Sequence, residues 1–169
     1  SLGSPDPEKL PGAMCFLEEN GNATSGATAL AAMAVAELPD PSGVRDPELK
    51  KKVAAVPRDR WLEGLGACML SMIDPDGAVF HNFRESRRHR RVVEEPLYFP
   101  GEVMLALARA HTRLGAPELL EGARRIGDRQ QRIYAAALAL GWPYPGDHWI
   151  VQALSEVART TEHRPYAEL

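Results

Sequence analysis

Two short triplets, each of proline, glycine and an acidic residue, have the clearest chemical potential in the chain. They are Pro100-Gly101-Glu102 and Pro145-Gly146-Asp147, and their acidic residues are 45 positions apart. His148 and Trp149 follow the second triplet directly. A carboxylate beside an imidazole, whose pKa can lie near neutrality, can transfer protons, and an indole ring offers a flat face for stacking. The Asp147-His148-Trp149 turn therefore predicts ligand contact if the chain has a ligand site.

A purely structural role also explains these residues. Glu102 and Asp147 each stand at an expected helix start, where a carboxylate interacts favourably with unpaired N–H groups and with the helix dipole. His148 can likewise bond a backbone carbonyl at the start of its helix. Capping requires only the carboxylate. The ligand-site interpretation differs from it in expecting His148 and Trp149 to contact a ligand.

The elements that must position these residues are helices. Apolar residues at spacings of three to four predict helices over residues 25–38, 59–72, 101–114, 117–126 and 147–157, and segments 46–56 and 129–140 are expected to add helix. Asp59 is the expected N-cap of the second helix, Gly115 ends the third, and residues 74–77, Asp-Pro-Asp-Gly, predict a turn. Residues 78–80 and 92–93 are predicted to pair as a short hairpin.

Composition limits the classes of protein that fit. With 169 residues, 44% of them hydrophobic and 25% charged, the chain is expected to form a single soluble helical domain over residues 1–169. A net charge of −3 argues against a dedicated binder of nucleic acid or of an anionic membrane. The longest apolar stretch, near residues 27–36, is too short to cross a bilayer.

Neither a metal nor a cofactor is predicted. Cys15 and Cys68 are too few for a disulfide framework or a zinc site, and both are interpreted as buried apolar residues. The sequence has no Gly-rich phosphate loop and no serine nucleophile elbow. Only Glu102, Asp147 and His148 can converge as ligands of a metal, which is too little to predict one.

An arginine-rich segment separates the two halves of the chain. Five of the eight residues at 84–91 are arginines, and Glu94 and Glu95 lie just beyond them as partners. A mobile, solvated basic loop is the simpler interpretation, although such a run can also bind a phosphate or an acidic polysaccharide. His111 lies well inside an expected helix and is interpreted as structural.

Helical repetition gives the chain a resemblance to known folds. Long Ala-rich helices alternate with shorter, more charged ones, as in stacked helical hairpins. Three stretches carry the likeness: PGEVMLALARAHTRLGAPELLEGARRIGDRQ at 100–130, PGDHWIVQALSEVART at 145–160, and DPDG at 74–77. They resemble the (α/α) toroid proteins, which include six-hairpin glycosidase-like enzymes, sugar epimerases and several polysaccharide lyases. The resemblance implies an all-α fold of antiparallel helical hairpins in a partial (α/α) toroid.

The chain holds material for only part of such a barrel. A full toroid needs more hairpins than the helices predicted here can supply. The barrel is therefore expected to be partial, completed by another chain, or cut from a longer protein.

The resemblance also implies where a ligand binds. In such toroids, substrates bind at the mouth formed by one set of helix ends and the loops around it. Carried onto this chain, Glu102 and Asp147 take acid and base roles, with His148 as the alternative proton carrier. The expected substrate-binding residues are Tyr98, Tyr144, Trp149, His81 and Asn22. For His81 and the adjacent Asn82, a solvated loop is the simpler alternative.

Two hypotheses about function follow. The first is a carbohydrate-active enzyme or a fragment of one, of the glycoside hydrolase, epimerase or lyase class, which binds a saccharide or another small polar ligand. The second is a non-catalytic helical-repeat module or scaffold, which the short chain favours. Carboxylates of Glu102 and Asp147 pointing into one aromatic-lined cavity favour the enzyme, whereas carboxylates that only cap their helices favour the module.

Overall fold

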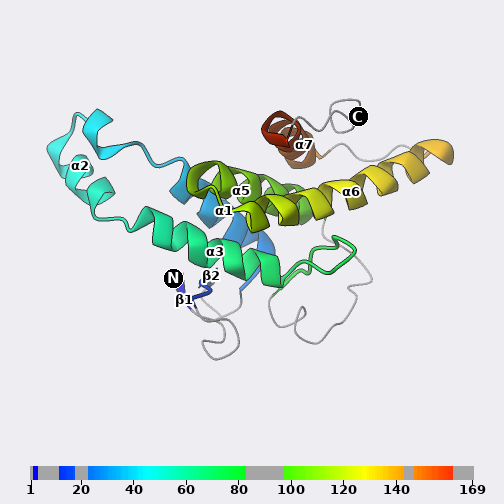
Figure 1. Ribbon diagram of the computed structural model, residues 1–169, viewed down its shortest axis with the longest axis horizontal. Helices are drawn as coiled ribbons and strands as arrows, with labels where there is room; N and C mark the ends of the chain where they lie inside the picture. Colours follow the sequence, from blue (N-terminus) through cyan, green and yellow to red (C-terminus); the bar gives the residue numbers. More distant parts are fainter. Residues whose placement is uncertain (1, 4–11, 18–22, 83–96, 143–146, 162–169) are drawn as a thin grey trace.

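The computed structural model describes residues 2–3, 12–17, 23–82, 97–142 and 147–161. These residues are mainly helical, which confirms the all-α fold class (Figure 1). The helices are α1 (Ser25–Ala36), α2 (Pro47–Ala54), α3 (Arg58–Ser71), α5 (Phe99–Leu114), α6 (Pro117–Ala139) and α7 (His148–Thr161), with a short 3-10 helix, η1 (Pro41–Gly43). Strands β1 (Leu2–Gly3) and β2 (Cys15–Phe16) pair antiparallel, with Leu2 opposite Phe16.

Local capping signals explain several helix boundaries. The Thr24 hydroxyl accepts a hydrogen bond from the Ala27 N–H at the start of α1, at 3.3 Å. Asp46 caps α2 in the same way through the Leu49 N–H, at 2.8 Å. Gly115 ends α5 with a left-handed backbone, φ 69°, as expected of a C-terminal glycine. The helices predicted to start near residues 25, 101 and 147 begin within two residues of those positions.

Two helix predictions differ from the structure. α3 begins at Arg58 without a side-chain cap, and the expected cap, Asp59, lies in the first turn, where its carboxylate pairs with Arg113 at 3.4 Å. α6 is one continuous helix, although the sequence suggested a short helix and a separate helical segment. Gly127 does not interrupt it because this residue is buried against the rest of the protein, and packing overrides its weak helix propensity.

The central helix, α5, lies between α1 and α7 (Figure 1). Arg109 of α5 pairs with Glu37, just beyond α1, at 3.1 Å, and with Glu156 of α7 at 3.6 Å. The first turns of the same three helices meet at the other end of α5. Because both ends are matched in this order, α1, α5 and α7 run in the same direction.

α3 and α6 run in the opposite direction. Arg58, at the start of α3, donates to the Pro39 carbonyl beyond the end of α1, at 2.7 Å. The pair between Arg113 and Asp59 places the end of α5 beside the start of α3. α6 reverses the chain directly after α5. α1 and α3, and likewise α5 and α6, therefore form antiparallel pairs, whereas α5 runs parallel to its neighbours α1 and α7.

The core is built around α5. All residues from Val103 to Ala108 are fully buried, so this helix is apolar on every side, as a helix at the centre of a domain must be. Its neighbours complete the core with fully buried Leu65 of α3, Ile126 of α6 and Val157 of α7. The described helices include none long and apolar enough to cross a membrane.

The two cysteines are joined. Cys15 of β2 and Cys68 of α3 form a disulfide with their Cα atoms 5.5 Å apart, and both residues are fully buried. The prediction that both cysteines are buried is confirmed, and the prediction that they are separate, unbonded residues is wrong. Ala23, Met72 and Phe80 pack around them in a second, smaller cluster.

The predicted turn after α3 is confirmed. The Asp74 carboxylate accepts two backbone hydrogen bonds within it, and Gly77 has a φ of 86°. Val79 then bridges to Ile73 in antiparallel fashion. Residues 92–93, the partners predicted from the sequence, lie outside the described residues, as does the arginine-rich segment 84–91.

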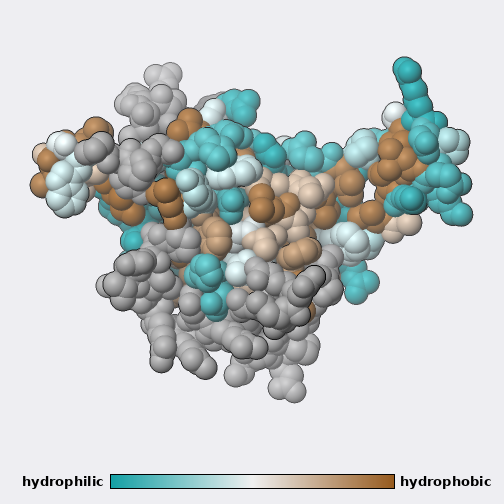
Figure 2. Space-filling model, turned by 180° about the vertical axis from the view of Figure 1, so that it is seen from behind, coloured by the Kyte–Doolittle hydropathy of each residue, from teal (hydrophilic) through white to brown (hydrophobic). Residues whose placement is uncertain are grey.

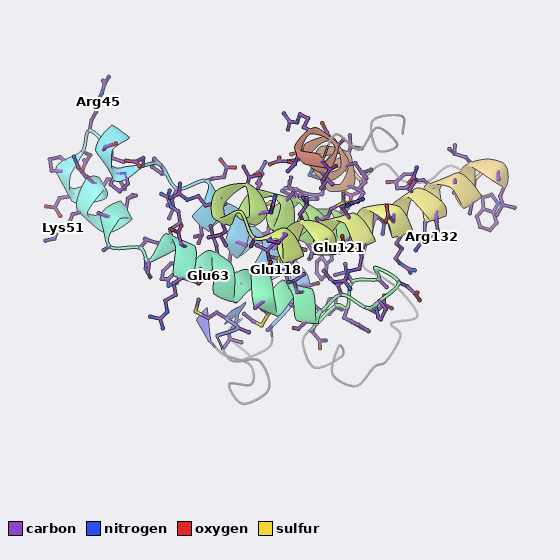
Figure 3. All side chains as sticks on the ribbon, viewed as in Figure 1. Arg45, Lys51, Glu63, Glu118, Glu121 and Arg132 are labelled. Atoms are coloured by element: carbon purple, nitrogen blue, oxygen red, sulfur yellow. A yellow bond between two sulfur atoms is a disulfide. The ribbon has the colours of Figure 1, made fainter. Side chains whose placement is uncertain are left out.

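An arm formed by η1 and α2 lies apart from the helix bundle (Figure 3). It carries the charged Arg45 and Lys51, and Val53 is the buried residue of α2. At the other end of the molecule, the last turns of α6 project beyond the bundle (Figure 1).

Candidate functional site

The first turns of α1, α5 and α7 meet at one end of the bundle and bring Glu102 and Asp147 together. A Cβ atom built on Gly26 of α1 would lie 2.7 Å from Glu102 Oε2. One built on Gly101 of α5 would lie 2.7 Å from Asp147 Oδ2. The missing side chains of the two glycines therefore make room for two carboxyl groups. We call this region the helix-start site, and its members are Ser25, Gly26, His81, Tyr98, Phe99, Gly101, Glu102, Asp147, His148 and Trp149.

Both carboxyl groups are buried. Glu102 is 7% exposed and Asp147 is 3% exposed. Burial raises the pKa of Glu102, and the nearby charge of Asp147 raises it further. Burial also raises the pKa of Asp147, but backbone N–H groups of Trp149 and Ile150 and the charge of His148 act against that rise.

The two carboxyl groups differ in what they bond. Asp147 Oδ1 accepts a hydrogen bond from the Trp149 N–H at 2.9 Å, so Asp147 does cap α7. Glu102 Oε2 is buried and has no hydrogen-bond partner among the described residues. Capping therefore accounts for Asp147 but not for this oxygen of Glu102. N–H donors stabilise a carboxylate anion, so the bond to Asp147 Oδ1 favours the ionised form of Asp147, and Glu102 Oε2 has no such donor among the described residues.

Aromatic side chains lie at the same helix starts as the two carboxyl groups. The His81 ring stacks on Phe99 with centroids 5.2 Å apart, and the rings of His148 and Trp149 lie 4.8 Å apart. Tyr98 lies 6.5 Å from the His148 ring and is half exposed. The region thus offers flat apolar faces next to polar groups, a combination that suits the binding of a ring-shaped polar ligand.

His81 does not sit on a separate solvated loop. Its backbone carbonyl accepts a hydrogen bond from the Ser25 N–H at 3.0 Å, which ties it to the first turn of α1. Asn82 bridges to Thr24 on the same side. The alternative that His81 and Asn82 lie on a solvated loop away from the helix starts is therefore wrong.

The structure brings together six of the residues predicted for the site. They are Glu102, Asp147, His148, Tyr98, Trp149 and His81. Tyr144 and Asn22, the other two, lie outside the described residues.

Sequence reasoning missed Gly26 and Phe99. A ring carbon of Phe99 would lie 2.5 Å from a Cβ atom on Gly26, so the phenyl ring fills the space beside Glu102. Gly26 follows an N-cap threonine, and Phe99 begins the segment that opens α5. Their positions at predicted helix starts were the signal that would have placed them near the carboxyl groups.

His111 has the structural role expected of it. Its Nδ1 lies 2.8 Å from the Ala116 carbonyl oxygen, at the end of α5 away from the helix-start site. Within the part of the chain that the structure describes, no three side chains of His, Cys, Asp or Glu are grouped so that they can hold a metal ion.

Comparison with known proteins assigns no family. No family model, no curated protein and no solved structure matches the chain. The helix-start site must therefore be interpreted from its own geometry.

Proposed function

We propose that the protein is a carbohydrate-active enzyme, or part of one, that binds a saccharide at the helix-start site. The observation that carries this proposal is the buried, unpartnered Oε2 of Glu102 beside a second buried carboxyl group, Asp147. An unpaired buried acceptor costs free energy, so its retention beside a second carboxyl group points to a role other than packing.

The pair is suited to acid–base chemistry on a glycosidic bond. Glycosidases use one carboxylic acid to protonate the leaving oxygen and one carboxylate as base or nucleophile. The hydrogen bonds support Glu102 as the acid and Asp147 as the carboxylate, because a backbone N–H donates to Asp147 and no donor reaches Glu102 Oε2 among the described residues. His148, next to Asp147, is the alternative proton carrier, and Trp149 supplies a face on which a sugar ring can stack.

The helix directions support a sector of an (α/α) toroid. α1, α5 and α7 run one way and α3 and α6 run the other, which is the alternation of inner and outer helices in that fold. Apolar side chains at and just beyond the end of α6 support the addition of further helices at that end. Leu138, Leu140 and Trp142 are each more than half exposed. Figure 2 shows hydrophobic side chains gathered at that projecting end. Another hairpin, or another chain, would bury them.

The test combines a glycan array with turnover measurements. Glu102→Gln and Asp147→Asn keep the shape of each side chain and remove its titratable charge, so each should lower turnover about 100-fold or more. Trp149→Ala should weaken saccharide binding. Matched controls are Glu118→Gln, an exposed acidic residue in the first turn of α6 (Figure 3), and Trp142→Ala, an exposed indole at the end of that helix.

Normal turnover in both carboxyl variants would place the active site elsewhere. Binding without turnover of any bound glycan would favour the second candidate function, a non-catalytic module. The exposed apolar end of α6 is the observation that supports this candidate, because such a surface suits contact with a partner.

A further inference from the structure

The phenyl ring of Phe99 lies beside the unpartnered oxygen of Glu102. A Cβ atom built on Gly26 would lie 2.5 Å from Phe99 Cε1 and 2.7 Å from Glu102 Oε2, so both atoms crowd one point in the first turn of α1. The His81 ring stacks on Phe99 with the ring planes 23° apart, and the Ser25 N–H holds the His81 carbonyl at 3.0 Å. Phe99 is thus held by α1 at its edge and by His81 on one face.

The ring is placed to act on the proton of Glu102. Phe99 is partly exposed, whereas the oxygen beside it is buried, and a side chain in that position can shield the oxygen from water. Ring C–H groups stabilise an anion far less than water or an N–H donor does. A carboxyl group that loses water and gains no donor holds its proton more strongly, and burial does raise the pKa of Glu102.

Other charges near Glu102 must be kept apart from the effect of the ring. The described groups that can carry charge on the elements around it are Asp147 and His148 of α7, His81 after α3, Tyr98 before α5, and Arg129 and Arg132 in the second half of α6. The first turn of α1 and the last turn of α3 carry no charged side chain. The charge of Asp147 adds to the raised pKa of Glu102. All of these groups stay in place when Phe99 is exchanged for another uncharged residue, so such exchanges isolate what the ring contributes.

We propose that Phe99 is a positioning residue for the acid of the site: its ring, held by α1 and His81, keeps water and N–H donors from Glu102 Oε2 and so favours the protonated side chain. As a role in acid catalysis, this inference rests on the proposed function, because Glu102 is the group that would protonate a glycosidic oxygen. The effect on the proton itself requires no saccharide, so it can be measured in the chain alone. Gly26 completes the arrangement, since the missing side chain lets the ring and the carboxyl group meet.

The experiment titrates the full chain by NMR, with an isotope label on the side-chain carboxyl carbons of glutamate. The signal that is missing from Glu102→Gln belongs to Glu102. Phe99→Met and Phe99→Gln form a matched pair of similar length, in which the first keeps an apolar cover and the second brings amide N–H donors. The midpoint of the Glu102 signal should stay above pH 4.5 in Phe99→Met and fall towards 4.5 in Phe99→Gln. Equal midpoints in the two variants would overturn the inference, because a ring that serves only packing would be replaced equally by either side chain.

Two further variants complete the test. Phe99→Ala admits water instead of an amide, so its midpoint should also fall towards 4.5, and an unchanged midpoint would again overturn the inference. Leu114→Ala truncates a partly buried side chain at the other end of α5 and should leave the midpoint unchanged; a shift of the same size there would refute a local cause.

Turnover separates this inference from the proposed function. With a glycan that is turned over, the alkaline limb of kcat/KM against pH should move to lower pH in Phe99→Gln and stay in place in Phe99→Met. If no glycan is bound or turned over, the proposed function is wrong, whereas the NMR midpoints still decide the role of Phe99.

Discussion

Replacing Cys15 and Cys68 together by alanine should lower the free energy of unfolding by about 4 kcal/mol. The two cysteines are 53 positions apart, and loop-closure entropy for a cross-link of that length gives about 4 kcal/mol at 25 °C. The closed loop contains α1, η1, α2 and most of α3, so the unfolded chain gains much freedom when the bond is absent. For a chain of this length, the change corresponds to a fall in melting temperature of about 8 to 16 °C.

Urea unfolding followed by circular dichroism measures this loss. The parent chain is compared with Cys15→Ala/Cys68→Ala, each with and without a thiol reductant. The chain has no other cysteine, so the reductant should destabilise the parent and leave the double variant unaffected. Reduced parent and double variant should then unfold at similar urea concentrations.

A loss below about 1 kcal/mol would refute the reasoning, because the cross-link would then restrict the unfolded state far less than its span requires. Free thiols measured in the untreated parent chain would contradict the bond itself. The N-terminal segment carrying Cys15 would in that case be held on α3 by packing and by the Met14 N–H, which donates to the Gly64 carbonyl at 2.9 Å.

Two further predictions concern the carboxyl pair and a turn. Because the folded chain raises the pKa of Glu102 above its ordinary value of 4.5, ionisation of Glu102 costs stability as the pH rises from 4.5 through the raised pKa. Glu102→Gln should therefore melt at a higher temperature than the parent at pH 7, with a difference that vanishes near pH 4; a pH-independent difference would contradict this. Gly77→Ala should cost several kcal/mol in urea unfolding, because Gly77 has a φ of 86° and an added Cβ would overlap the backbone of α6, whereas Gly43→Ala, with open space around it, should be nearly neutral. Similar stabilities for the two glycine variants would show that the turn can move away from α6.

Features set by neighbours in the sequence could be predicted. Gly115 and the turn at residues 74–77 have conformational requirements that their own residues meet, so both were found in the expected places. The starts of α1, α5 and α7 were likewise predictable to within two residues. Glu102 and Asp147 could be proposed as neighbours only through the resemblance to toroids, which stays a prediction.

Features set by tertiary contact could not be predicted. Nothing about the spacing of Cys15 and Cys68 indicates that β2 crosses the end of α3, which is what brings them within bonding distance. Asp59 has the local chemistry of an N-cap, but α3 begins one residue earlier and Asp59 pairs with Arg113. The continuity of α6 through Gly127 depends on burial that helix propensity does not register.

The starts of α5 and α7 are in direct backbone contact, and this contact fixes the spacing between the two helices at the candidate site. A Cβ atom on Gly101 would lie 2.5 Å from the Ile150 backbone nitrogen, so the two backbones approach each other with no layer of side chains between them. No rotamer change can widen or narrow that gap. The position of Asp147 relative to α5 is therefore fixed before any ligand arrives, which spares the free-energy cost of organising the carboxyl group during binding.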